Sequence, residues 1–231
     1  MIRNNIYSIF MFMLLVFLLP TDSFARISLS TVIVDFEPGK PPYRDVFVNN
    51  ESDEKAYVQI EIAELRDPGT PEQTRHVITS KSFKDLIVSP RKLVIPPRGR
   101  KRIRYISQHK DLDKDKIYRV KVEPMVGNIK AENIVVKIVI AYDTLVIVRP
   151  SVLKPDFSIK RKGKEITVTN TGNTSVLLRK GEQCNADKSA CEKTPGKRIH
   201  AGKIWVGQLP IDGPIDYTFS VGGKLMLQHV D

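Results

Sequence analysis

Short apolar runs separated by turn-forming residues fill the chain beyond its first 25 residues. In residues 56–62 apolar and polar side chains alternate, which is the pattern of a strand with one buried and one solvated face. Gly, Pro, Asn and Asp cluster between the runs, as in Asp67-Pro68-Gly69, and these residues favour turns. No window has apolar residues at the spacing of an amphipathic helix. The pattern predicts an all-β protein built as a sandwich or barrel.

The runs fall into two groups, divided at Arg149-Pro150. The strands predicted before this point are residues 27–36, 44–48, 56–65, 85–88, 92–95, 101–106, 117–122, 133–140 and 144–148. The strands predicted after it are residues 157–159, 165–170, 176–178, 203–206, 217–221 and 224–228. We therefore expect two sandwich domains, 26–149 and 150–231, with one larger sandwich as the alternative.

The first 25 residues have the composition of an export signal. Arg3 precedes an apolar run at residues 9–19, Pro20 ends it, and the small residues Ser23 and Ala25 lie before Arg26. A basic start, a short apolar run and a small-x-small exit predict a secretory signal peptide. A membrane anchor is the alternative, but a transmembrane helix needs roughly 20 apolar residues and this run is shorter. We expect an exported protein without stable membrane insertion.

Composition and charge add little about chemistry. The chain has 231 residues, 41% hydrophobic and 27% charged, with a formal net charge of +11. An acidic partner, an anionic surface or simply solubility could explain this excess of positive charge. Five cations are concentrated at Arg98, Arg100, Lys101, Arg102 and Arg104. Nucleic acid is not expected as a partner because the chain is predicted to be exported; heparin, lipopolysaccharide or a solvated hairpin remain as explanations.

Two cysteines, Cys184 and Cys191, lie in a segment rich in turn formers. In an oxidising compartment this spacing favours a disulfide that closes a hairpin loop. A redox pair would more often be Cys-x-x-Cys, and a metal site would need further ligands, whereas His200 stands alone nine residues away. We expect the disulfide, with no metal and no cofactor.

One predicted strand departs from the alternating pattern. Ile134, Val136, Ile138 and Ile140 form one apolar face, and the other face is broken only by Lys137. A strand that is apolar on both faces needs a partner on each. It could be a central strand covered by the protein itself, the seam of a homodimer, or an edge strand that pairs with an incomplete client protein.

In this context the chain resembles the periplasmic pilus chaperones, the PapD-like superfamily. The resemblance covers nearly all of the exported chain and depends on the order of several segments. These are Val48-Asn49-Asn50-Glu51-Ser52, Val88-Ser89-Pro90-Arg91-Lys92-Leu93-Val94-Ile95-Pro96-Pro97, Lys101-Arg102-Ile103-Arg104, Tyr118-Arg119-Val120, Arg149-Pro150 and Val168-Thr169-Asn170-Thr171-Gly172-Asn173. The chain is most similar to the alternate class, which serves class 5 and colonisation-factor fimbriae.

The resemblance implies two immunoglobulin-like β-sandwich domains in a boomerang arrangement. It also implies a periplasmic protein that lends a strand to pilus subunits (pilins) and delivers them to an outer-membrane usher. The groove-filling positions of the family correspond to Val136, Ile138 and Ile140, with Ile134 extending the row. Self-association of the client-free protein stays an open alternative.

The family also holds the C-terminal carboxylate of the subunit with two basic residues in the interdomain cleft. This sequence departs from that pattern, because residues 27–36 contain no Lys or Arg and Leu145 stands at the second position. A carboxylate still favours a charged donor, and preferably Arg. We therefore expect Arg119 as an anchor, with Lys121 as the second candidate and Arg104 as the third; each could equally be a solvated surface cation.

Catalysis is not expected. The four histidines are scattered, no nucleophile stands in a catalytic motif, and there is no Gly-rich phosphate loop. The main alternative to the chaperone is a secreted β-sandwich adhesion or carbohydrate-binding module, which would present aromatic side chains at loop tips; Trp205 is the single tryptophan.

Overall fold

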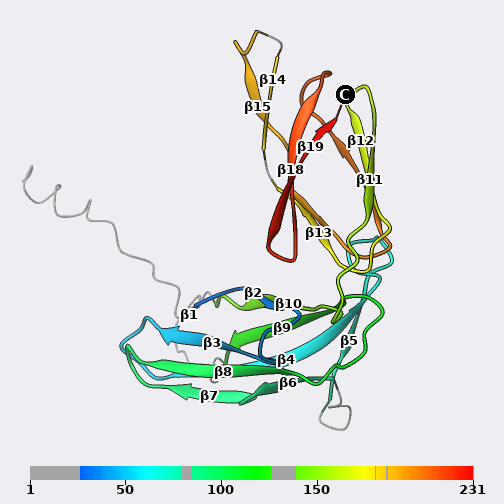
Figure 1. The fold of residues 1–231 in the computed structure, drawn as a ribbon. Helices are drawn as coiled ribbons and strands as arrows, with labels where there is room; N and C mark the ends of the chain where they lie inside the picture. Colours follow the sequence, from blue (N-terminus) through cyan, green and yellow to red (C-terminus); the bar gives the residue numbers. More distant parts are fainter. Residues whose placement is uncertain (1–26, 80–84, 126–138, 180, 186, 231) are drawn as a thin grey trace, which may run out of the picture.

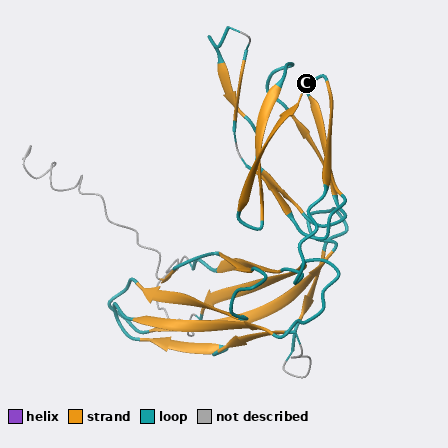
Figure 2. Ribbon diagram, viewed as in Figure 1, coloured by secondary structure: helices purple, strands orange, loops and turns teal. Residues whose placement is uncertain are grey.

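The structure is a computed structural model that describes residues 27–79, 85–125, 139–179, 181–185 and 187–230. All regular elements in these ranges are strands, and they form two sandwiches that stand at an angle to one another (Figures 1 and 2). The fold is therefore all-β, with two immunoglobulin-like sandwiches, as the sequence predicted. No helix that could span a membrane occurs among these residues. The predicted signal peptide lies outside them.

The first sandwich consists of two sheets, which we call sheet A and sheet B. Sheet A has the order β1-β3-β8-β6, with β1 (Ile27–Leu29), β3 (Tyr43–Asn50), β8 (Arg100–Ser107) and β6 (Leu86–Ser89). Sheet B has the order β2-β10-β9-β4-β5, with β2 (Ile33–Phe36), β10 (Tyr142–Val148), β9 (Lys116–Pro124), β4 (Ala56–Arg66) and β5 (Thr74–Val77). β7 (Lys92–Ile95) also pairs with β4.

The predicted strand at residues 27–36 is two strands in different sheets. β1 pairs with β3 in sheet A, and β2 pairs in parallel with β10 in sheet B. The bend between them contains Thr31, whose hydroxyl donates to the Ile33 carbonyl and accepts from the Ile33 N–H. Threonine side chains compete in this way with the regular hydrogen bonds of a strand. The bend lets one apolar run contribute to both sheets.

Alternation along the strands builds the core of the first sandwich. On β4 the inward-facing Val58, Ile60 and Ile62 are buried, while Tyr57 and Gln59 are exposed. The same alternation on β9 buries Val120 and Val122. The core that these side chains form does not extend into the second sandwich.

The second sandwich has a separate core, which includes Ile166, Val168, Tyr217 and Phe219. One sheet has the order β11-β12-β17, with β11 (Phe157–Lys162), β12 (Glu165–Asn170) and β17 (Ile204–Gln208). The other has the order β16-β13-β18-β19, with β16 (Lys197–Ile199), β13 (Val176–Leu178), β18 (Ile215–Val221) and β19 (Lys224–Val230). A small hairpin of β14 (Glu182–Cys184) and β15 (Cys191–Lys193) extends from this sandwich (Figure 1).

Most of the predicted apolar strand, including Ile134, Val136 and Ile138, lies outside the described residues. Val139 and Ile140 are described, and they lie immediately before β10 without belonging to a strand. Both are exposed, with 38% and 48% of their surface accessible. Ile140 is therefore not covered by any part of the chain that the structure describes.

Candidate functional site

The edge of β10 is only half paired. On one side β10 pairs with β9 along its whole length, from Tyr142 opposite Val122 to Val148 opposite Lys116. On the other side the pairing with β2 begins at Leu145, so that residues 142–144 have no neighbouring strand there among the described residues. Unpaired strand edges accept further strands. This open edge leads directly back to Ile140 and the apolar segment.

Arg119 lies on the outer face of sheet B, close to this edge. It is opposite Leu145 on β10, and 34% of its side chain is exposed. Its guanidinium donates to the Asp143 carbonyl at 3.1 Å, and its Nε lies 3.8 Å from the Asp143 carboxylate. Arg75 on β5 pairs with the same carboxylate. The charge of Arg119 is thus partly balanced by a carboxylate of its own chain.

Of the three candidate anchors, the structure groups two and separates the third. Lys121 is two residues along β9 from Arg119 and so lies on the same face, where it pairs with Glu123 at 2.8 Å. Arg104 lies on β8 in sheet A, where it makes two hydrogen bonds of 2.8 Å to Asp45. Because the core of the sandwich separates the outer faces of the two sheets, Arg104 cannot share a carboxylate with Arg119.

A buried arginine joins the two sandwiches. The side chain of Arg149, which follows β10, is only 3% exposed and makes paired hydrogen bonds of 2.8 and 2.7 Å to Asp35 on β2. It also donates to the Thr174 hydroxyl of the second sandwich at 2.5 Å. Burial by itself would lower the pKa of Arg149, but the hydrogen bonds to Asp35 and the charges of Asp35 and Asp115 raise it. Arg149 therefore stays charged at the junction.

Asp115 makes a second connection at the junction. Its carboxylate accepts the Ser175 N–H at 2.6 Å, and its own N–H donates to the Asn173 carbonyl at 3.0 Å. Burial raises the pKa of Asp115, while the Ser175 N–H and the charge of Arg149 oppose the rise. These contacts fix the segment between β12 and β13 of the second sandwich against the residue that precedes β9.

A hollow of about 490 Å³ lies between the sandwiches beside this junction. Leu65 and Ile117 line it from sheet B, and His200 and Ala201 line it from the second sandwich. Leu65 and Ile117 form a buried cluster with Ile147 on the outer face of sheet B, separate from the core. Burial on an outer face needs cover from elsewhere, and the second sandwich supplies part of it.

His200 is strongly perturbed in this position. Burial lowers its pKa to about 4, and the nearby charges of Arg198, Arg119, Lys197 and Lys203 add to the effect. Its Nδ1 is buried and has no hydrogen-bond partner among the described residues. Burial and these four cations, of which Arg119 comes from the first sandwich, therefore favour the neutral ring of His200.

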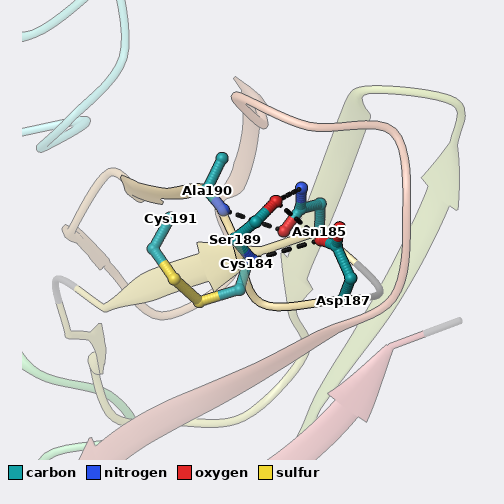
Figure 3. Close-up of a disulfide and its surroundings, with 6 residues drawn as sticks. All are labelled: Cys184, Asn185, Asp187, Ser189, Ala190 and Cys191. Carbon is teal, nitrogen blue, oxygen red and sulfur yellow. Dashed lines mark hydrogen bonds between the residues drawn. A yellow bond between two sulfur atoms is a disulfide. The ribbon is translucent and has the colours of Figure 1, made fainter.

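The two cysteines form a disulfide that closes the tip of the β14–β15 hairpin (Figure 3). Cys184 and Cys191 are paired across the hairpin with their Cα atoms 4.0 Å apart. Hydrogen bonds among Asn185, Asp187 and Ser189 hold the loop beyond them. Glu182 lies near both sulfurs, but sulfurs bonded to one another cannot serve as thiolate ligands. The predicted pairing is what the structure contains.

The sequence placed Arg149-Pro150 at the boundary between the two domains, but the Arg149 network was not predicted from it. The signal was Asp35, the one charged residue in an otherwise apolar or neutral segment, residues 27–36. A lone acid in such a segment suggests a buried ion pair. Asp143, the partner of Arg119, was missed because ion pairs across a sheet depend on register, which the sequence did not provide.

Solved structures with this architecture include fimbrial chaperones. One is the class 5 fimbriae chaperone CfaA, with a TM-score of 0.64 and 22% identity over 88% of this chain and 98% of that chain. Another is a chain of the CFA/I chaperone–tip adhesin complex, with a TM-score of 0.59 and 24% identity over 88% and 98%. This chain has the fold of a fimbrial chaperone. The resemblance drawn from the sequence is confirmed at the level of the fold.

The chaperone fold extends beyond class 5 structures. A chain of the complex between the Salmonella enterica SafA pilin and the SafB chaperone matches with a TM-score of 0.62 and 13% identity, over 91% of this chain and 98% of that chain. In sequence, residues 39–149 match the family described as the CS5 fimbrial protein N-terminal domain. A CS1 fimbrial subunit of Escherichia coli is 27% identical over 167 residues, 67% of this chain and 69% of that protein. Both sequence matches carry fimbrial names.

Proposed function

We propose that this protein is a periplasmic chaperone that binds fimbrial subunits by lending them a strand. The observation that carries the proposal is the open edge of β10, which directly follows the apolar row ending at exposed Ile140. An extended client segment that pairs with this edge would use main-chain hydrogen bonds, and the apolar row would fill the client's core. The fold shared with fimbrial chaperones supports the same role.

The size of the apolar row is sufficient for tight binding. Burial of one Val or Ile side chain contributes roughly 1.5–3 kcal/mol, so four such side chains contribute about 6–12 kcal/mol before the losses on association. The row is Ile134, Val136, Ile138 and Ile140. Without a partner, such a row would promote aggregation, so we expect the protein to work with a client or to self-associate.

We further propose that Arg119 and Lys121 bind the C-terminal carboxylate of the subunit. They share the outer face of sheet B beside the open edge, and Arg119 is accessible. Arg119 already contacts Asp143. It must loosen this contact before its guanidinium can donate fully to the carboxylate of a subunit. Delivery of the complex to an outer-membrane usher completes the proposed pathway.

Substitution of the apolar row tests the strand-lending mechanism. With a fimbrial subunit co-expressed, Ile138→Asp and Ile140→Asp are expected to reduce the subunit recovered with the protein at least tenfold, because each places a charge in the client's core. Leu227→Asp is the matched control, since Leu227 is a 68% exposed apolar residue on β19 of the other sandwich. Equal recovery with all three variants would rule out strand lending.

The anchor residues can be tested independently with two variants of opposite expected effect. Arg119→Gln removes the proposed carboxylate donor and should weaken subunit binding by about tenfold. Asp143→Asn removes the competing carboxylate and should strengthen binding, because Arg119 then carries an unbalanced charge. Subunit titration by calorimetry measures both, and weaker binding by Asp143→Asn would remove Arg119 from the site.

A second candidate is a structural component of the fimbria, which the name of the CS1 relative favours. A structural component stays in the assembled fibre, whereas a chaperone leaves its subunit before assembly. Immunodetection in sheared fimbriae and in the periplasmic fraction separates the two. Presence in washed fibres would overturn the chaperone proposal.

A further inference from the structure

Three arginines form a line on the outer face of sheet A. This face points away from the second sandwich. Arg100, Arg102 and Arg104 are alternate residues of β8, while the intervening Ile103 and the following Tyr105 point into the core. Arg102 and Arg104 have 55% and 38% of their side chains exposed, and Arg100 is also exposed. We call these three residues the arginine row.

Two aromatic side chains of the neighbouring strand β3 support the row. The guanidinium carbon of Arg100 lies 3.8 Å from the centre of the Phe47 ring, and that of Arg104 lies 4.7 Å from the centre of the Tyr43 ring. Stacking on a ring restricts a guanidinium, and Arg104 is held further by two hydrogen bonds from its Nε and Nη2 to Asp45. The ends of the row are therefore held in place before any ligand binds.

The row has more positive charge than its surroundings balance. The acidic residue beside the row is Asp45 on β3, which lies opposite Arg104 and contacts both Arg104 and Arg102. The hydrogen bond from Arg104 lowers the pKa of Asp45, with the charges of Arg104 and Arg102 acting in the same direction. Arg100 has no ion pair among the described residues, and Glu51, just beyond β3, accepts a hydrogen bond from the Ser28 hydroxyl instead. Asp45 thus contacts two of the three guanidinium groups, and no carboxylate of the described residues pairs with the third.

From this geometry we propose that the arginine row is a docking site for an acidic, extended segment of a partner protein. Alternate residues of a strand repeat about every 6.6–6.8 Å, so the Cα atoms of the three arginines have this spacing along β8. Carboxylates at alternate positions of an extended peptide have the same repeat. A segment with three such acids would meet the three cations in register, each through a charge-assisted hydrogen bond. The site is distinct from the client site, because the core of the sandwich lies between them.

The test uses an extended heptapeptide with glutamates at three alternate positions, and its glutamine counterpart. Fluorescence anisotropy with the full-length exported protein is expected to detect the glutamate peptide only. The double variant Arg100→Gln/Arg102→Gln should bind it at least tenfold more weakly. Phe47→Leu keeps all charges but removes one ring, and should weaken binding about threefold through loss of the fixed Arg100 orientation.

The matched control is Lys160→Gln/Lys162→Gln. Lys160 and Lys162 are exposed cations at alternate positions of β11, and no aromatic ring of the described residues stacks on them. Their double substitution removes two positive charges, as Arg100→Gln/Arg102→Gln does. Binding within twofold of the unaltered protein is expected. Equal losses of peptide affinity in both double variants would mean that net charge alone governs binding, and would overturn the proposal. Failure to bind the glutamate peptide, or binding of phosphatidylglycerol vesicles in its place, would also overturn it; neither outcome bears on subunit capture.

Discussion

His200 shows how a single side chain reports the closeness of the two sandwiches. Its imidazole lies beside the interdomain hollow, near Gly69 of the first sandwich, so that a Cβ at Gly69 would approach its Cδ2 to 3.3 Å. Burial and four surrounding cations both disfavour the protonated ring. The neutral ring fits this site, and the charged ring does not.

This predicts acid sensitivity. The pKa of His200 is about 4 in the folded protein, against 6.5 for an unperturbed histidine, so the unfolded chain binds the proton more readily between these values. Stability from this group is present above pH 6.5 and is lost as the pH falls towards 4. Between pH 7 and pH 5 the loss is about 2 kcal/mol.

Urea unfolding at the two pH values measures this loss. His200→Gln should reduce the pH dependence by that amount, whereas His76→Gln, a change at an exposed residue of β5, should leave it unchanged. An unaltered pH dependence in His200→Gln would show that the ring is accessible to protons in the folded state. Comparison of variants is necessary because burial also lowers the pKa of His109.

Strands were the elements that the sequence predicted best, because alternation is a local property. The predicted strand at residues 92–95 coincides with β7, and that at 165–170 coincides with β12. The run at 27–36 was wrong as one strand, because the bend depends on side-chain hydrogen bonds of Thr31 that alternation does not reveal. β5 was missed because all four of its residues are exposed and carry no apolar pattern.

The disulfide hairpin should contribute to stability mainly through the unfolded chain. Cross-linking Cys184 to Cys191 restricts a short loop in the unfolded state, which corresponds to about 2 kcal/mol. The double variant Cys184→Ser/Cys191→Ser should therefore unfold at lower urea concentration. Dithiothreitol should destabilise the original protein to the same extent and leave the variant unaffected. If the reducing agent has no effect on the original protein, the hairpin unfolds independently of the sandwich.

At the scale of the molecule, the two-domain β architecture was predictable, whereas the junction was not. Two groups of strands around an Arg-Pro junction predicted two cores, and two cores are observed. The contacts between the sandwiches involve residues far apart in sequence, such as Arg149 and Thr174, or Asp115 and Ser175. Their pairing depends on the folded positions of both domains. The client-binding residues remain predictions.

Removal of Arg149 is expected to uncouple the sandwiches. Arg149→Gln leaves Asp35 and Asp115 without their cation, and breaking a buried pair in this way lowers stability by about 3 kcal/mol. Trp205, the only tryptophan, packs against the second core, so its fluorescence follows that sandwich while circular dichroism follows both. In the original protein the two signals should change together during urea unfolding, and in the variant they should separate.

Lys203→Gln is the control for this experiment. Lys203 also bridges the sandwiches, through an ion pair of 2.8 Å with Asp67, but that aspartate is largely exposed. Solvent-exposed pairs contribute little, so the two signals should still coincide. Coincident transitions in Arg149→Gln would mean that the other contacts at the junction, such as those of Asp115 with Ser175 and Asn173, are sufficient to couple the domains.

The bend at Thr31 determines how much of the β10 edge is paired within the first sandwich. By crossing from one layer to the other, the N-terminal run joins the two layers at one side, yet it reaches β10 only from Leu145 onward. A crossing placed three residues earlier would let the same run cover the rest of β10 and seal it. The position of this one bend therefore decides whether β2 pairs with the whole edge of β10 or leaves residues 142–144 open on that side.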